Sequence, residues 1–143
     1  MKLSKMFLNL KTSLFCVLFI AAIGSGCKIG KQNTSPKLFN GKDLTGWEIT
    51  DFAGSGEIKV KDSELHIGMG ELISGINLAH DTIPRSNYEL EAEALKVDGD
   101  DFFCAITFPL GKTYATFIPG GWGGSVVGIS SIDGMDAAEN ETA

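Results

Sequence analysis

The chain has few cysteines, and their positions exclude a disulfide scaffold. Only three occur in 143 residues. Cys16 lies in an apolar N-terminal run, and Cys27 directly follows the small residues Gly24-Ser25-Gly26. If both belong to an export signal, Cys104 has no partner for an intrachain disulfide. Because Cys104 stands among apolar residues, it is expected to act as a small hydrophobic side chain rather than as a nucleophile.

Positive charge is also scarce, which argues against a nucleic-acid partner. The chain contains 12 basic and 18 acidic side chains, a net charge of −6. Cleavage before Cys27 would remove three of the 12 basic residues and none of the 18 acidic ones, which leaves a net charge of −9. Such a surface repels phosphate backbones.

The N-terminus has the pattern of an export signal. Lysines precede the apolar run Leu14–Ile23, which at about ten residues is too short to span a bilayer but suits a signal-peptide core. Small residues directly before Cys27 are typical of a bacterial lipoprotein cleavage site. We therefore expect a signal peptide at 1–26, a lipidated tether at 27–37 and a cell-envelope location through a lipid anchor on Cys27. Ordinary signal-peptidase cleavage with a soluble product is the alternative.

The rest of the chain lacks a sustained 3.6-residue apolar period and shows a period of two instead. Alternating or apolar segments, separated by glycine-rich turns, predict an antiparallel β-sandwich. The expected strands are 57–61, 64–67, 88–94, 102–108, 113–118 and 125–129. The segment 102–108 is apolar nearly throughout, which predicts a central strand covered on both faces.

The domain is expected to span 38–143 and to open with a folded-back plug. The stretch "LFNGKDLTGW" at 38–47 places apolar residues, among them Trp47, around the turn formers Asn40-Gly41 and Gly46. Its other end, 137–143, is polar and precedes no further strand. We therefore expect a truncated or divergent copy of a longer domain.

The same opening stretch resembles the start of the bacterial 3-keto-disaccharide hydrolase family. The segment 86–93, "SNYELEAE", resembles a strand motif of that family that ends in the glutamate matching Glu93. The resemblance implies an exported, often lipidated, concanavalin-like jelly roll that cleaves 3-keto-glycosides. The sequence departs from the family at Leu95, where many members have arginine, and at 101–103, where many have an Asn-Ser-Gly turn. Both departures put catalysis in question more than fold.

The implied reaction needs a base to remove the C2 proton, a proton donor for the leaving oxygen and stabilisation of the enolate. His66 and Glu64 share one strand face by period two and form one candidate base pair. Glu93, at the family position, and His80, in a loop, are the other catalytic candidates. Solvated surface positions are the alternative interpretation for all four.

Other residues are candidates for binding. Asp98, Asp100 and Asp101 crowd one turn and offer oxygen ligands for a divalent cation, although turn chemistry alone also explains them. Trp122, between glycine pairs, is a candidate for stacking on a sugar ring or, equally, for a core position. Asp133 and Asp136 are expected beside it if their loop closes over the same end.

Two functions remain open from the sequence. The first is a lipid-anchored enzyme that cleaves oxidised glycosides by proton abstraction and elimination. The second is a non-catalytic carbohydrate-binding or interaction module on the same sandwich. Both functions imply a carbohydrate partner, and in both the lipid anchor is the only expected contact with the membrane.

Overall fold

The computed structural model describes residues 1–10, 36–81 and 83–143, and within them the chain forms strands and turns but no helix. The strands are β1 (Lys2–Leu10), β2 (Trp47–Ile49), β3 (Ile58–Lys61), β4 (Glu64–Ile67), β5 (Ile76–Leu78), β6 (Tyr88–Leu95), β7 (Ile106–Leu110), β8 (Thr113–Gly121) and β9 (Val126–Ser130).

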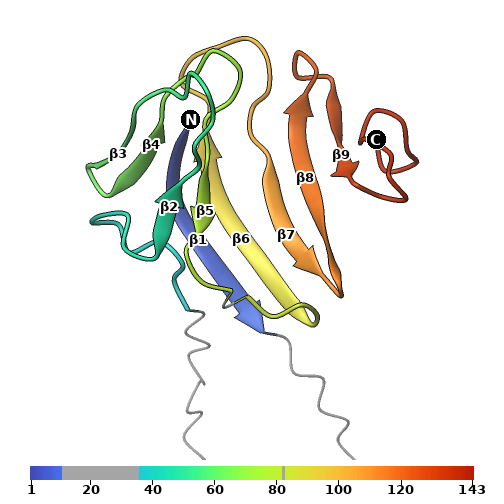
Figure 1. Cartoon of the computed structure of the whole chain (residues 1–143), viewed down its shortest axis with the longest axis horizontal. Helices are drawn as coiled ribbons and strands as arrows, with labels where there is room; N and C mark the ends of the chain where they lie inside the picture. Colours follow the sequence, from blue (N-terminus) through green and yellow to red (C-terminus); the bar gives the residue numbers. More distant parts are fainter. Residues whose placement is uncertain (11–35, 82) are drawn as a thin grey trace, which may run out of the picture.

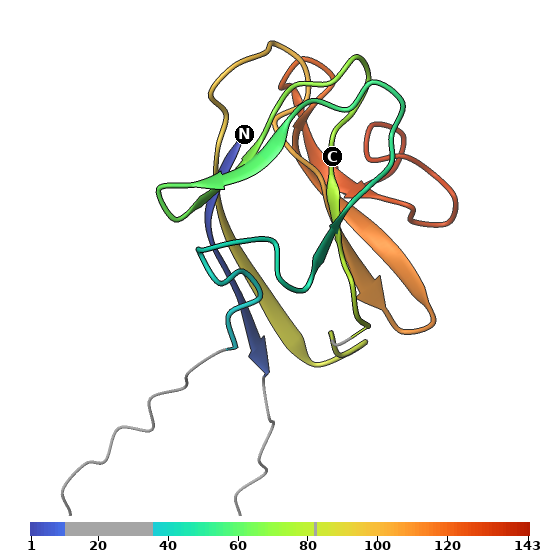
Figure 2. The same ribbon diagram turned by 60° about the vertical axis from the view of Figure 1, so that its left-hand side comes forward.

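These strands form three antiparallel sheets that are not closed into a barrel (Figures 1 and 2). One has four strands in the order β3-β4-β1-β6, one pairs β2 with β5, and one has the order β7-β8-β9. The prediction of an all-β chain with antiparallel sheets is therefore confirmed, and the arrangement is compatible with a β-sandwich.

The period-two pattern sets which face of each strand is buried. Along β6, half-buried and exposed residues alternate from Tyr88 to Leu95. In β4, Leu65 is only 1% exposed, while Glu64 and His66 on either side of it point to the opposite face. Alternation in the sequence thus identified the inward residues of these strands correctly.

The main core lies beneath the four-stranded sheet. Leu3, Met6, Phe39 and Leu65 are its buried residues, and partly buried side chains from the opening segment and from β2 to β6 pack around them. Phe39 and Trp47 come from the opening segment, and Nε1 of Trp47 donates a hydrogen bond to the carbonyl of Leu38 at 2.9 Å. The opening segment therefore folds back onto the core, and its role as a plug at an end of the sandwich stays a prediction.

The interpretation of 102–108 as a covered central strand is wrong. Strand β7 begins only at Ile106, and it lies at an edge of its sheet while β8 is central. Phe102 is 43% exposed. The apolar run was misleading because its first part does not lie in a ladder: it crosses between sheets, and its aromatic residues pack against the turn after β8.

The C-terminal segment protects one edge of the three-stranded sheet. The amide of Ile129 donates to Oγ1 of Thr142 at 2.8 Å, and Nδ2 of Asn140 donates to the carbonyl of Ile129 at 2.8 Å. Oγ of Ser130 accepts the amide of Ala137, which is fully buried. Side chains of the C-terminal segment therefore bind backbone groups that would otherwise have no hydrogen-bond partner at the edge of the sheet.

The N-terminal residues form an interior strand of the four-stranded sheet. Strand β1 lies between β4 and β6 and coincides with the first part of the expected signal peptide. The expected lipidation site Cys27, the apolar run and nearly all of the tether lie outside the described residues. Within the described part of the chain, no helix has the length and apolar character needed to cross a membrane.

Candidate functional site

Several strand ends meet at one end of the molecule. Because β1 runs antiparallel to β4 and β6, its first residues lie beside the last residues of both partners. Lys2 is in register with His66 on one side and with Leu95 on the other. Two of the predicted site residues, Glu64 and His66, lie at this end.

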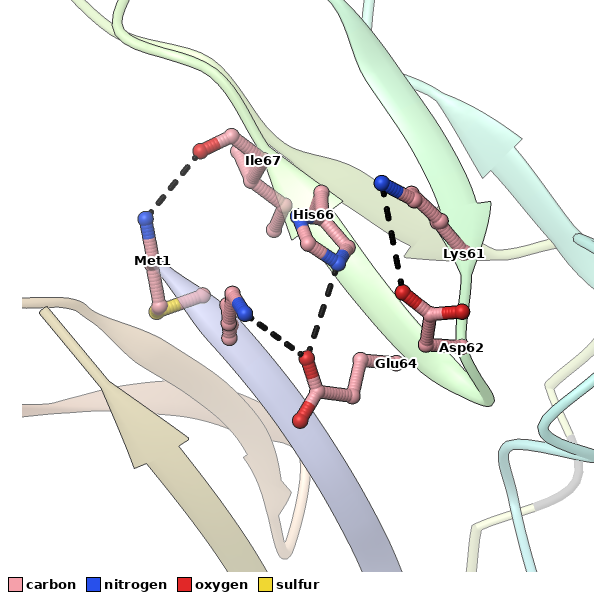
Figure 3. A network of polar contacts seen from close by, with 7 residues as sticks. Met1, Lys61, Asp62, Glu64, His66 and Ile67 are labelled. Atoms are coloured by element: carbon pink, nitrogen blue, oxygen red, sulfur yellow. Dashed lines mark hydrogen bonds and ion pairs between the residues drawn. The ribbon is translucent and has the colours of Figure 1, made fainter. Parts of the chain in front are cut away.

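Glu64 stands between two nitrogen groups (Figure 3). Its Oε2 lies 3.2 Å from Nζ of Lys2 and 3.6 Å from Nε2 of His66. The three side chains are about a quarter to a third exposed, so the charges are partly shielded from water. The expectation that Glu64 and His66 share one strand face is confirmed, and Lys2 joins them from β1.

The imidazole of His66 has an unsatisfied nitrogen. Nε2 is buried, and it has no hydrogen-bond partner among the described residues, because 3.6 Å to Glu64 is too long for a hydrogen bond. Buried polar atoms are normally paired. An imidazole beside a carboxylate has the composition of an oriented imidazole base.

The other two catalytic candidates are placed differently. Glu93 lies on the exposed face of β6, in register with Lys5 of β1, and makes polar interactions of its own. His80 is exposed and follows β5. Its neighbour Asp81 is 3.0 Å from the guanidinium of Arg85, and this hydrogen bond, together with one to Tyr114, raises the pKa of Arg85. The structure therefore brings Glu64 and His66 into contact but not His80.

Trp122 lies in the turn between β8 and β9. Its backbone has a φ of 47°, and both Gly123 and Gly124 after it also have positive φ. The indole is 42% exposed and packs at a tilt against Phe102, with 5.1 Å between ring centroids. Among the described residues Nε1 of this indole has no hydrogen-bond partner, unlike Nε1 of Trp47. The pair Phe102–Trp122, called the aromatic platform below, is half-exposed.

Asp101 connects this platform to the end of β6. Its Oδ1 accepts the amide of Gly123 at 3.3 Å, and its carbonyl accepts Nζ of Lys96 at 2.6 Å. Lys96 directly follows Leu95, the register partner of Lys2. A continuous line of neighbours thus leads from His66 across β1 and β6 to Trp122.

The three aspartates predicted as metal ligands do not converge. Oδ1 of Asp98 accepts the amide of Gly99, and Asp101 is engaged with the platform turn. Within the described ranges, no group of three His, Cys, Asp or Glu side chains is placed to hold a metal ion. Hydrogen bonds of the turn account for Asp98 and Asp101, and a divalent cation at this turn stays a prediction.

Asp133 and Asp136 lie in the loop after β9, whereas Trp122 lies in the turn before it. The five residues of β9 separate the two positions. The loop is organised locally by hydrogen bonds between Met135 and both Ser131 and Ile132. The structure therefore does not place these two aspartates beside the platform.

Cys104 is half-buried, and its burial raises the pKa of the thiol. Less thiolate forms at neutral pH, which agrees with its interpretation as a hydrophobic side chain.

Three residues of this end were not found from the sequence. Lys2 was assigned to the signal peptide, and Phe102 to a covered strand. Lys96 carried no signal at all, since a single lysine after a strand is ordinary.

Comparisons of the chain with protein-family models, with curated proteins and with solved structures found no match. The resemblance to the 3-keto-disaccharide hydrolases therefore depends on the short motifs at 38–47 and 86–93.

Proposed function

We propose that this protein is a carbohydrate-binding β-sandwich domain that is exported and held at the cell envelope by a lipid on Cys27. The observation that carries the proposal is the aromatic platform. An indole in a left-handed backbone conformation, half-exposed and supported by a second ring, is suited to stack on the apolar face of a sugar.

The surroundings of the platform support a polar ligand. Nε1 of Trp122, which has no hydrogen-bond partner among the described residues, offers a donor, and the carboxylate of Asp101, which accepts the amide of the next residue Gly123, offers an acceptor. The turn is tied down by the bonds of Asp101 to Gly123 and Lys96, so little ordering accompanies binding. A jelly-roll connection of the sheets, as in the resembling family, is part of this proposal.

Binding can be measured by titrating the full chain with gluco- and 3-keto-gluco-oligosaccharides while Trp fluorescence or calorimetry is recorded. Trp122→Ala is expected to weaken binding by about 1–3 kcal/mol, the range in which loss of one stacking aromatic falls. Tyr114→Ala is the matched control, because Tyr114 is an exposed aromatic at the other end of β8. Equal affinity of the two variants would contradict the proposal.

Cleavage of 3-keto-glycosides is the second candidate, and the contact between Glu64 and His66 favours it. In that reaction the imidazole would take the C2 proton while Glu64 orients the ring and stabilises its charged form. The ammonium of Lys2, 3.2 Å from Glu64, lies beside this pair only in the uncleaved chain, since cleavage before Cys27 removes it. Glu93 remains a candidate proton donor on the neighbouring strand.

A chromogenic 3-keto-glucoside tests this candidate. Release of the aglycone by the full chain, reduced at least about 100-fold in His66→Ala and retained in the surface variant Glu48→Gln, is expected for general-base catalysis. A parallel assay with EDTA tests the expected divalent cation. Sugar binding without any turnover would contradict catalysis and support the binding function.

A further inference from the structure

The strand at the centre of the four-stranded sheet is the segment that the sequence marks as an export leader. Strand β1 is paired along all of β6, from Lys2 opposite Leu95 to Leu10 opposite Tyr88. On its other side it is paired with the end of β4. Because β1 lies between β4 and β6, these two strands are separated by two strand spacings, about 9–10 Å.

This segment also contributes a large part of the core. Leu3 and Met6 are two of the four buried residues in the main cluster. They lie in register with Ala94 and Ala92 of β6, whose small side chains leave space for the larger partners. Large residues on β1 thus complement small residues on β6, which is the usual sign of specific packing.

The backbone of this segment is tied to three other parts of the chain. Met1 and Ile67 exchange hydrogen bonds, since the N-terminal ammonium donates to the carbonyl of Ile67 and the amide of Ile67 donates to the carbonyl of Met1, both at 3.2 Å. The carbonyl of Met6 accepts the amide of Leu38 from the opening segment. Without β1, peptide groups of β4 and β6 and the amide of Leu38 would all lose partners.

We propose that the groove between β4 and β6 is a strand-binding site whose occupant is the N-terminal segment Lys2–Leu10 of this chain. The groove selects an extended antiparallel segment with apolar side chains at the positions of Leu3 and Met6 and an ammonium group opposite Glu64. This is recognition by β-strand addition, in which backbone pairing gives affinity and side-chain pockets give selectivity.

The same residues cannot pair in this sheet and enter an export channel at once. The folded precursor therefore keeps its leader in the sheet, and after cleavage before Cys27 the groove becomes free only when the cut segment dissociates from it. This inference concerns strand binding and is independent of any affinity for sugar.

A nicking experiment tests the groove on the full chain. A protease site is introduced at Lys11-Thr12-Ser13, outside both the groove and the apolar run, and the folded protein in mild detergent is cut there. The N-terminal fragment is expected to stay bound through gel filtration. Fluorescent Met1–Leu10 peptide added in excess is expected to replace it, with anisotropy reporting its binding.

Variant peptides distinguish specific strand binding in the groove from non-specific adsorption of the peptide. Leu3→Asp with Met6→Asp is expected to reduce binding by more than about tenfold, because two charges would enter the core. Lys2→Ala is expected to have a smaller effect, since the ion pair with Glu64 is partly solvated. Failure of the unmodified peptide to bind, or equal binding of the doubly charged peptide, would overturn the proposal.

Hydrogen exchange gives a second, variant-free measurement. In the uncut full chain, the amides of β6 that face β1 are expected to be strongly protected from exchange. The same protection is expected after the chain is nicked and washed with competitor peptide that carries no fluorophore. Rapid exchange of these amides in the uncut chain would show that β1 does not occupy the groove and would equally overturn the proposal.

Discussion

At the scale of single residues, hydrogen bonds from two neighbours hold the carboxylate of Asp43 in the opening segment. Hydrogen bonds from Thr45 and Asn40 lower the pKa of Asp43 from 3.8 to about 2. Oδ1 of Asn40 in turn accepts the amides of Lys42 and Asp43. The ionised form of Asp43 is therefore part of the turn that places Phe39 in the core.

This arrangement predicts a pH dependence of stability. Because the pKa is lower in the folded chain, the stabilisation is complete above about pH 3.8 and is lost as the pH falls toward about 2. Urea unfolding of the wild type and of Asp43→Asn, compared from pH 6 to pH 2, is expected to show a smaller acid-induced loss in the variant. Asp51→Asn is the control, and identical pH profiles for wild type and Asp43→Asn would contradict the assignment.

A second prediction at this scale concerns Leu65, the largest fully buried side chain among the described residues. Leu65→Ala is expected to lower the free energy of unfolding by about 2–5 kcal/mol, through lost apolar burial and the cavity that remains. Leu72→Ala is the matched control, since Leu72 is 91% exposed and is expected to change stability by less than about 0.5 kcal/mol. Chemical denaturation measures both.

At the scale of elements, two chain segments approach each other closely at glycine. A Cβ at Gly56 would lie 2.3 Å from the carbonyl oxygen of Met69 and 2.7 Å from the backbone of Gly68. The close approach lets the amide of Gly68 donate to the carbonyl of Glu57 at 2.8 Å and extends the pairing of β3 with β4.

Gly56→Ala is therefore expected to destabilise the protein by about 1–3 kcal/mol, because backbone rather than a flexible side chain must move. Gly75→Ala is the control: its Cβ would meet only the ring edge of Phe52 at 3.3 Å and Oγ1 of Thr50 at 3.9 Å. Thermal or urea unfolding of both variants tests this prediction. Equal losses of stability would show that the close backbone contact at Gly56 does not determine the cost of the substitution.

The strands that alternate strictly could be predicted from the sequence, and those that depend on distant partners could not. The segments at β3, β4 and β6 carry their own period of two, so their existence and inward faces follow locally. The segments at β8 and β9 were also expected as strands, but burial along β8 does not alternate, since Ala115 and Ile118 are its buried apolar residues. Strand β5 has only three residues and is defined by pairing with β2. Strand β1 has the composition of a leader, and nothing local indicates that it completes a sheet.

The candidate site could likewise be predicted from the sequence only in part. The shared face of Glu64 and His66 follows from their spacing, and the exposure of Trp122 follows in part from the surrounding glycines. The contact with Lys2 depends on β1 entering the sheet, and the support of Trp122 by Phe102 depends on where the chain crosses between sheets. Neither contact can be predicted from the local sequence of Glu64 or of Trp122.

At the scale of the whole molecule, the three-stranded sheet has one apolar face that is incompletely covered. Register places the side chains of this face on alternate positions of β7, β8 and β9. Among them Leu110, Phe117 and Val127 are each more than a third exposed.

An exposed apolar face of this kind is expected to bind a hydrophobic dye in the native state. The double variant Leu110→Thr, Val127→Thr is expected to reduce the fluorescence of bound anilinonaphthalene sulfonate, with little loss of stability because both side chains are about half exposed. Tyr114→Thr is the matched control, since Tyr114 has similar exposure but lies on the other face of β8. If the control reduced the signal as much as the double variant, the dye would not be reporting this face, and the uncovered surface would have to lie elsewhere on the molecule.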